Sequence, residues 1–266
     1  MIRDITLGQY YQTESSVHRL DPRTKILGTL LYIVSLFLVK NYYGFIICTL
    51  ALFLTIAISH VPVSFIVRGL KPIIVILMFT FLLNVFMVPG EVIFSFWIFK
   101  VTKEGINTAI FMAIRLMLLI MGSSLLTLTT KPLQLTDGLE SLFRPLKVIG
   151  FPSHEIAMMM SIALRFIPTL LEETDKIIKA QEARGADLES GNLIHKVKAL
   201  IPILVPLFVS AFRIAQDLAL AMEARCYHGG DGRTRLHEMK FKKGDIFSFL
   251  LMAIFLASII LINRIM

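Results

Sequence analysis

The sequence predicts an all-α, polytopic membrane protein. About five transmembrane helices are expected, with a cytosolic or interfacial domain of one short and two long crossed helices between the fourth and the fifth. An apolar composition, five apolar stretches of near-spanning length and a long amphipathic segment with two similar helical patterns lead to this prediction. The N-terminal transmembrane helices are placed in residues 1–130, the cytosolic-side domain in 131–245 and the C-terminal transmembrane helix in 246–266.

Composition separates this chain from soluble proteins. Of its 266 residues, 56% are apolar and 17% are charged, whereas soluble domains carry about a quarter charged residues. A net charge of +8 could indicate nucleic-acid binding, but that requires a basic face on a soluble domain, and no such domain is predicted. Cys48 lies in an apolar run and Cys226 in a polar segment, so no disulfide is expected. No cleavable signal peptide is expected either.

Five apolar stretches are expected to cross the bilayer, which takes about 20 helical residues. They cover residues 26–39, 42–59, 72–89, 105–130 and 246–263. The first is the shortest, and we expect it to begin a turn earlier, where Asp21 suits the N-cap and Pro22 the first helical position. Arg23 and Lys25 would then mark the cytosolic edge, with side chains that snorkel toward water.

The distribution of basic residues predicts the orientation. If the N-terminus is cytosolic, 22 Lys and Arg residues fall on the cytosolic side and four fall in the outer loops and tail. Sixteen of these 22 lie in residues 131–245. Because Lys and Arg collect on the cytosolic side of membrane proteins, we expect a cytosolic N-terminus.

Polar and aromatic residues in the membrane part have simple interpretations. Residues 91–104 are too short to cross the bilayer and indicate a re-entrant or interfacial element on the outer side, with Trp97 in an aromatic belt. Asn84 and Arg115 lie at membrane depth, where such groups either line a path or pack within the bundle. We favour packing, with Arg115 near a helix end or paired with a carbonyl, since the spans contain no acidic relay partner.

The segment after the fourth span begins with a short amphipathic helix that Pro132 opens and Gly150 closes. A long helix then runs from Ser153, a candidate N-cap, to Gly185, which suits a left-handed helix terminator. Over residues 153–184 it would extend roughly 48 Å, which exceeds the thickness of a bilayer core. Its first half is apolar and its second half is charged, so we expect it to leave the lipid.

A second long helical pattern repeats this design and ends in the same phrase. Residues 180–184 are Ala-Gln-Glu-Ala-Arg, residues 221–225 are Ala-Met-Glu-Ala-Arg, and Pro168 and Pro206 precede them. The helix dipole explains one cation at a C-terminus but not two copies flanked by Ala. A guanidinium is a rigid fork suited to carboxylates and carbonyls. Two such tips predict crossed helices and a partner with two like sites, such as a dimer.

These motifs resemble those of the transmembrane (T) component of energy-coupling factor (ECF) ABC transporters, in the cobalt-uptake permease superfamily. HRLDPRTK at residues 18–25 is similar to that family's N-terminal signature. EARG at 182–185 and EARCY at 223–227, followed by GRT at 232–234, resemble its paired Ala-Arg-Gly motifs. The resemblance covers nearly the whole chain.

The resemblance implies a role, partners and contact residues. The chain would be a non-catalytic, multi-pass subunit of the prokaryotic plasma membrane, and residues 131–245 would be its coupling domain. It would transmit ATP-driven closure of two cytosolic ABC ATPases, identical or homologous, to a membrane-embedded S component that binds a vitamin or another micronutrient. No cofactor or metal is expected in this chain, since the ATPases would bind ATP and Mg. The residues implied to contact the ATPases are Ala183, Arg184 and Gly185 for one and Ala224, Arg225 and Cys226 for the other.

Two of these features allow more than one interpretation. Cys226 stands where the family pattern has Gly, so Gly229 or Gly230 is expected to end that helix instead. The run Met158, Met159 and Met160 is compatible with core packing and with an adaptable surface for several interchangeable S components.

Two other classes of protein fit the sequence less well. An integral membrane enzyme could use His154, His195 and His228, but H-E-x-x-H is absent, and so is the phosphate-binding motif of an ATPase. A stand-alone secondary carrier would show inverted repeats of spans and a buried ionisable residue at mid-depth. The repeat here lies in the long helices instead.

Overall fold

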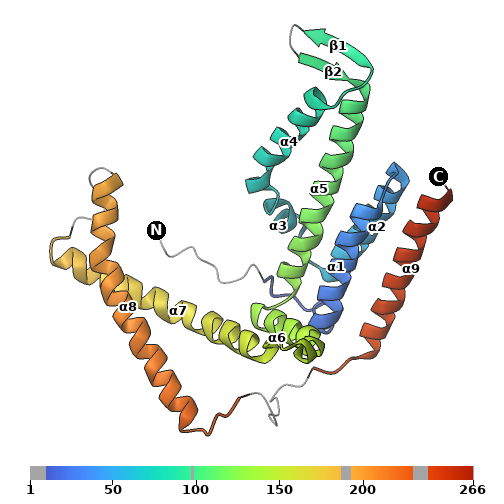
Figure 1. The fold of residues 1–266 in the computed structure, drawn as a ribbon. Coiled ribbons are helices and arrows are strands. Elements are labelled where there is room, and N and C mark those ends of the chain that lie inside the picture. Colours follow the sequence, from blue (N-terminus) through green and yellow to red (C-terminus); the bar gives the residue numbers. More distant parts are fainter. Residues whose placement is uncertain (1–9, 97–98, 187–192, 230–238, 266) are drawn as a thin grey trace. The chain divides into compact units, whose positions relative to one another are not determined.

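The structure is a computed structural model that describes residues 10–96, 99–186, 193–229 and 239–265 (Figure 1). The chain forms two compact units. The bundle unit comprises the described parts of Thr6–Leu142 and His237–Met266, and the long-helix unit comprises those of Phe143–Leu236.

The bundle unit contains most of the secondary structure. Its elements are α1 (Pro22–Leu38), α2 (Tyr42–Ser59), α3 (Val63–Arg68), the 3-10 turn η1 (Lys71–Ile73), α4 (Ile74–Met87), β1 (Val92–Phe96), β2 (Phe99–Thr102), α5 (Lys103–Thr129), α6 (Pro132–Phe143) and α9 (Lys243–Ile265). The long-helix unit contains the 3-10 turn η2 (Arg144–Ile149), α7 (Ser153–Ala183) and α8 (Leu193–Glu223).

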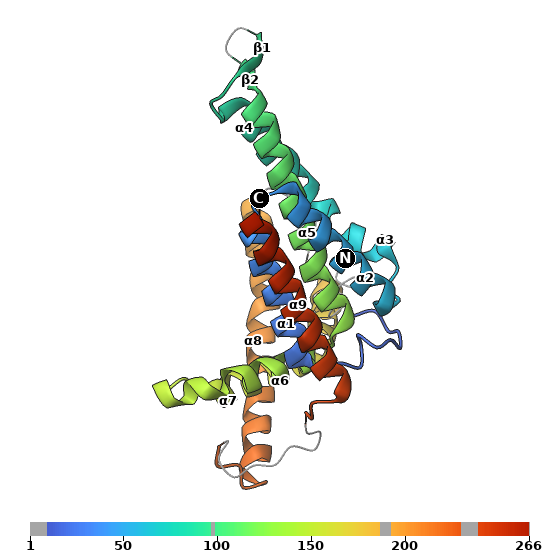
Figure 2. The ribbon, with the colours of Figure 1, turned by 90° about the vertical axis from the view of Figure 1, so that its right-hand side faces the viewer.

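α1 and α9 run parallel and α5 runs antiparallel to both, and hydrogen bonds at the helix ends fix this arrangement. The starts of α1 and α9 meet where the Asp21 amide donates to Asp245 Oδ1 at 2.8 Å, and their ends meet where Asn263 Nδ2 donates to the Leu38 carbonyl at 2.7 Å. The start of α1 also meets the end of α5, since Lys25 Nζ donates to the Thr129 carbonyl at 2.9 Å. The chain therefore leaves the bundle after α5 and re-enters it at α9 on the same side (Figures 1 and 2).

The core of the bundle lies between α1, α2, α3, α5 and α9. Its fully buried side chains include Leu36, Cys48, Ile66 and Ile259. Gly122 lets α5 approach α1 closely, because a Cβ there would lie 2.6 Å from the Tyr32 ring. Many large apolar side chains face outward instead, as they do on α4, where Val75 is 70% exposed. Such an apolar exterior matches hydrocarbon as the surrounding solvent.

Six helical segments among the described residues are long and apolar enough to cross a membrane. They are Tyr42–Ser59, Val63–Met87, Lys103–Thr129, Ser153–Ala183, Lys198–Glu223 and Lys243–Arg264. The predicted all-α, polytopic membrane class is confirmed. α1 has 17 residues and is not among these six, whereas the two long helices α7 and α8, which were expected on the cytosolic side, are. α1 begins at Pro22 after an Asp21 N-cap, as expected.

The predicted outer element at residues 91–104 includes a two-stranded antiparallel hairpin. β1 pairs with β2 in a register that sets Phe96 opposite Phe99. The hairpin joins the end of α4 to the start of α5 (Figure 1). Trp97 lies outside the described residues.

Two local predictions between α5 and α7 are wrong. The short amphipathic helix does not run on to Gly150, because α6 ends at Phe143 and the chain continues as the 3-10 turn η2. Pro145 accounts for this change, since it has no N–H to continue the α-helical ladder. Ser153 is not the N-cap of α7 but its first residue, and Pro152 holds the cap position. Gly150 does take the expected left-handed conformation, with φ of +83°.

Candidate functional site

The two repeated phrases end α7 and α8 in the same backbone geometry. In each phrase the arginine follows the last helical turn: the Arg184 amide donates to the Gln181 carbonyl at 3.1 Å, and the Arg225 amide donates to the Met222 carbonyl at 3.1 Å. The next residue is left-handed in both, with φ of +83° at Gly185 and +54° at Cys226.

The hydrogen bonds that close the two helix ends also match. At the first end, Gly185 N donates to Glu182 O at 2.9 Å and Ala186 N donates to Gln181 O at 3.0 Å. At the second end, Cys226 N donates to Glu223 O at 2.8 Å and Tyr227 N donates to Met222 O at 3.1 Å. These are the two bonds of the Schellman motif. The sequence repeat is therefore a repeat of backbone structure.

The prediction that Gly229 or Gly230 ends the second helix is wrong. Cys226 adopts the left-handed conformation itself, although a side chain there costs about 1–2 kcal/mol relative to glycine. The Schellman bonds of Cys226 and Tyr227 hold it in place. Gly229 has a φ of +100° but lies beyond the helix end, and Gly230 lies outside the described residues.

All six residues predicted at the helix tips are exposed: Ala183, Arg184, Gly185, Ala224, Arg225 and Cys226. Each guanidinium extends from a residue whose backbone is fixed by its own helix end, next to an alanine that offers no steric obstacle. The arrangement presents two cationic forks of the same local geometry to solvent or to a partner.

α7 and α8 cross and contact each other within the long-helix unit (Figure 1). Gln181, in the last turn of α7, donates from Nε2 to the carbonyl of Pro202 in α8 at 3.2 Å. After the second tip, Tyr227 Oη lies 3.4 Å from His154 Nε2 at the start of α7. Nothing in the local sequence pattern pointed to either contact.

The methionine run at the start of α7 faces outward in part. Met159 is 58% exposed and Met160 42% exposed, while Met158 is half-buried. Within the long-helix unit, Met159 and Met160 therefore do not pack in a core.

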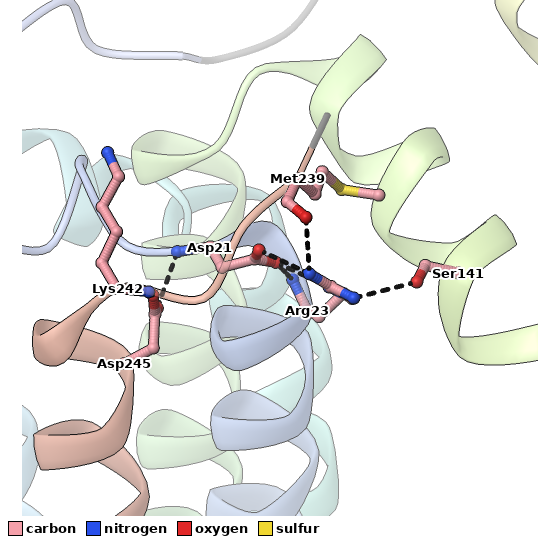
Figure 3. Close-up of polar contacts among 6 residues, drawn as sticks. All are labelled: Asp21, Arg23, Ser141, Met239, Lys242 and Asp245. Carbon is pink, nitrogen blue, oxygen red and sulfur yellow. Dashed lines mark hydrogen bonds and ion pairs between the residues drawn. The ribbon is translucent and has the colours of Figure 1, made fainter. Parts of the chain in front are cut away.

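A polar cluster ties the starts of α1 and α9 to α6 (Figure 3). Asp245 is fully buried and accepts two backbone hydrogen bonds, from Asp21 at 2.8 Å and from Lys242 at 2.7 Å. Lys242 immediately precedes α9, so the second bond is half of a capping box. An acidic residue at the third position of the last helix was the signal that could have identified Asp245 from the sequence.

Arg23 is the centre of the same cluster and does not snorkel to water as predicted. Its side chain donates to both carboxylate oxygens of Asp21, to Ser141 Oγ in α6 at 3.2 Å and to the Met239 carbonyl at 3.3 Å. Its guanidinium also lies 4.0 Å from the centre of the Phe241 ring. Burial alone would raise the pKa of Asp21, but the hydrogen bonds and charge of Arg23 outweigh it and hold that pKa below its usual value.

Lys25 is buried as well, contrary to the snorkelling prediction. Its Nζ donates to the His18 carbonyl at 3.0 Å and to the Thr129 carbonyl at 2.9 Å, at the end of α5. The last carbonyls of a helix lack intrahelical donors and carry negative partial charge. They therefore offer Lys25 a better environment than the apolar membrane edge.

The polar groups at membrane depth pack as predicted. Arg115 Nη2 donates to the Val39 carbonyl at the end of α1 at 2.9 Å, and its guanidinium lies 5.0 Å from the centre of the Phe111 ring. Asn84 Nδ2 donates to the Thr80 carbonyl one turn earlier. In the described part of the chain, no three His, Cys, Asp or Glu residues could together hold a metal ion. Cys48 and Cys226 are free thiols.

These features define a multi-pass, all-α membrane protein with a pair of long, arginine-tipped helices. The chain matches the family model of the cobalt transport protein CbiQ over residues 13–236. It is 53% identical over 263 residues to the energy-coupling factor transporter transmembrane protein EcfT of Ruminiclostridium cellulolyticum, covering 99% of this chain and 98% of that one.

Two further relatives carry the same description. The protein of Clostridium kluyveri is 55% identical over 267 residues, covering 100% of this chain and 98% of its own. That of Bacillus subtilis is 47% identical over 265 residues, covering 99% and 100%. The chain therefore belongs to the family of transmembrane components of energy-coupling factor transporters.

Proposed function

We propose that this chain couples two cytosolic ABC ATPases to a membrane-embedded S component for the uptake of a vitamin or another micronutrient. It hydrolyses nothing itself and holds no cofactor, since the ATPases bind ATP and Mg. The observation that carries this proposal is the pair of matched, exposed arginine ends on α7 and α8.

The ends of the bundle helices support a position on one side of the membrane for the segment between α5 and α9. α5 ends and α9 begins on the same side of the bundle, next to the start of α1. The segment between α5 and α9 is therefore attached at both ends to one side. Sixteen of the 27 Lys and Arg residues lie in residues 131–245, and such residues collect in the cytosol. This side, and the N-terminus with it, is assigned to the cytosol.

The tips provide the chemistry for docking. Ala183, Arg184 and Gly185 contact one ATPase, and Ala224, Arg225 and Cys226 contact the other. Arg donates up to five hydrogen bonds in a fixed fork, which fits carboxylates and helix-end carbonyls in a groove. Because both tips have the same Schellman geometry, two identical or homologous ATPases find equivalent contacts despite the Gly-to-Cys difference.

The S component is expected to dock on an apolar surface that includes Met158, Met159 and Met160. Two of these side chains are exposed, and Met side chains adapt to differently shaped partners. This flexibility suits a surface that serves several interchangeable S components.

Purification of the tagged chain from native membranes tests the proposal. We expect two ABC ATPases and a small membrane protein to co-purify with the parent chain. Arg184→Ala with Arg225→Ala is expected to lose the ATPases while still inserting in the membrane. Arg213→Ala, at an exposed position in the middle of α8, is the matched control and is expected to retain them. Retention of both ATPases by the double variant would refute the docking assignment.

A further inference from the structure

The two repeated phrases differ at one position, and the structure gives that position a specific contact. Within Ala-x-Glu-Ala-Arg, x is Gln181 in α7 and Met222 in α8. Gln181 donates from Nε2 to the Pro202 carbonyl of α8 at 3.2 Å. The phrase that ends α7 thus contacts the other long helix through the residue that is not repeated.

The acceptor is available because of a proline one turn later. In an α-helix the carbonyl of residue 202 would accept from the amide of residue 206. Pro206 lies inside α8 and has no N–H, and a proline ring also pushes the carbonyl four residues earlier away from the helix axis. Pro206 therefore leaves the Pro202 carbonyl without its intrahelical donor and turns it outward.

The contact fixes one point on each helix. Apolar packing is non-directional, and ridges-into-grooves packing leaves a scatter of about 15–20° in the angle at which two helices cross. A hydrogen bond to one carbonyl requires a donor within about 3 Å and in line with it. Gln181 meets this requirement only if the last turn of α7 lies over the turn of α8 that Pro206 opens.

We infer that Gln181 is a positioning residue that fixes the crossing of α7 and α8 and so the separation of the two arginine tips. Arg184 lies three residues beyond the contact on α7. Arg225 lies 23 residues beyond it on α8, roughly 35 Å away at 1.5 Å per residue. A rotation of about 10° at the crossing would move Arg225 by roughly 6 Å and would also disrupt the 3.4 Å contact of Tyr227 Oη with His154 Nε2 next to the second tip. That the distance between the two tips matches two ATPases rests on the proposed function.

The tip-to-tip distance in the isolated full-length chain tests the inference without any partner. One spin label is placed on the native, exposed Cys226 and one on Glu182→Cys, while Cys48 stays unlabelled because it is buried. Double electron–electron resonance in lipid nanodiscs is expected to show a single narrow distance. Gln181→Leu is similar in size but cannot donate a hydrogen bond, and it is expected to broaden the distribution of distances between the two labels.

Two further variants separate the hydrogen bond from general packing. Pro206→Ala restores the amide that the Pro202 carbonyl lacks and realigns that carbonyl with the helix axis. The Gln181 side chain then loses its acceptor, so the distance distribution should broaden even though alanine favours the helix more than proline does. Met222→Leu changes the equivalent residue of the other phrase and should leave the distance unchanged.

The inference would be overturned if the distance distribution of Gln181→Leu were as narrow as that of the parent chain. It would also be overturned if Pro206→Ala left the distribution unchanged, or if Met222→Leu broadened it equally, because a specific hydrogen bond predicts neither of these results. Since no ATPase is present, these outcomes are independent of whether the arginine tips bind one.

Discussion

Asp245 receives a hydrogen bond from the backbone amide of Asp21, 224 residues earlier in the chain, at 2.8 Å. The same carboxylate receives the Lys242 amide at 2.7 Å. It thus completes the N-terminal ends of the first and last helices of the bundle at once. Both amides are among the groups that a helix leaves without intrahelical partners.

Asp245→Ala is expected to destabilise the bundle by about 3 kcal/mol or more, since hydrogen bonds to charged groups contribute about 1.5–3 kcal/mol each. Thermal unfolding of the purified chain in detergent measures the effect. Glu14→Gln removes an exposed ion pair with Arg19 and should change stability by less than about 1 kcal/mol. Equal unfolding temperatures for the two variants would contradict the role of Asp245.

Replacement of Arg23 should be at least as costly. Arg23→Met leaves the buried carboxylate of Asp21 uncompensated, and breaking a buried pair in this way costs about 3–5 kcal/mol. Arg23→Lys keeps the charge but cannot reach Asp21, Ser141 and the Met239 carbonyl together, so it should recover only part of the loss. Adding Asp21→Asn to Arg23→Met should restore stability in part. If the double variant is less stable than Arg23→Met alone, the ion pair is not the source of the effect.

Cys226→Gly is expected to stabilise the last turn of α8 by about 1 kcal/mol, because glycine adopts a positive φ without the steric cost of a side chain. Gly185→Ala is the reverse change at the matching position and should destabilise the last turn of α7 by a similar amount. Hydrogen exchange of the amides that close each helix measures both. The assignment fails if Cys226→Gly speeds exchange at residues 226 and 227.

His18 should make stability depend on pH. Burial, followed by the nearby charge of Lys25, lowers the pKa of His18 from 6.5. The folded state thus favours the neutral ring, which lies 2.7 Å from Ser15 Oγ through Nδ1. The contribution of His18 to the free energy of unfolding is complete above the pKa of His18 in the unfolded state. It declines as the pH falls below about 6.5 toward the pKa of His18 in the folded state. The difference in melting temperature between the parent chain and His18→Gln should therefore be largest at pH 8 and smaller at pH 5. A difference that does not change with pH would exclude His18 as its source.

The native thiol of Cys226 reports the orientation. In cells that produce the chain alone, a membrane-impermeant maleimide is expected to label Cys226 in inside-out vesicles but not in intact cells. The buried Cys48 should stay unmodified in both preparations, and the Cys226→Ala variant is the blank. Labelling in intact cells would reverse the predicted topology.

Local sequence was sufficient wherever local chemistry decides the structure. Asp21 and Pro22 start α1, and Gly150 and Gly185 take positive φ, because each needs only its neighbours in the chain. The six tip residues were likewise recognised from the repeated phrase, and the structure places all of them at exposed helix ends. Their contacts with ATPases stay a prediction.

Where the sequence misled, distant residues decide the conformation. Arg23 and Lys25 look like surface cations at a membrane edge, but partners far along the chain, at Ser141, Met239 and Thr129, draw them inward. The bond between Gln181 and Pro202 likewise depends on how two helices cross. Cys226 shows a different limit, because the preference for glycine at positive φ is worth only about 1–2 kcal/mol and two closing hydrogen bonds can overcome it.

The tie between Asp21 and Asp245 also bears on biosynthesis. A ribosome delivers α1 to the membrane long before α9, and during that interval the Asp21 amide lacks its carboxylate and Arg23 lacks the Met239 carbonyl. α1 is thus among the last helices of the bundle to be completed. Chains that terminate before residue 239 would keep a half-satisfied charged cluster at the membrane edge, a defect that membrane proteases could use to recognise and remove unfinished copies.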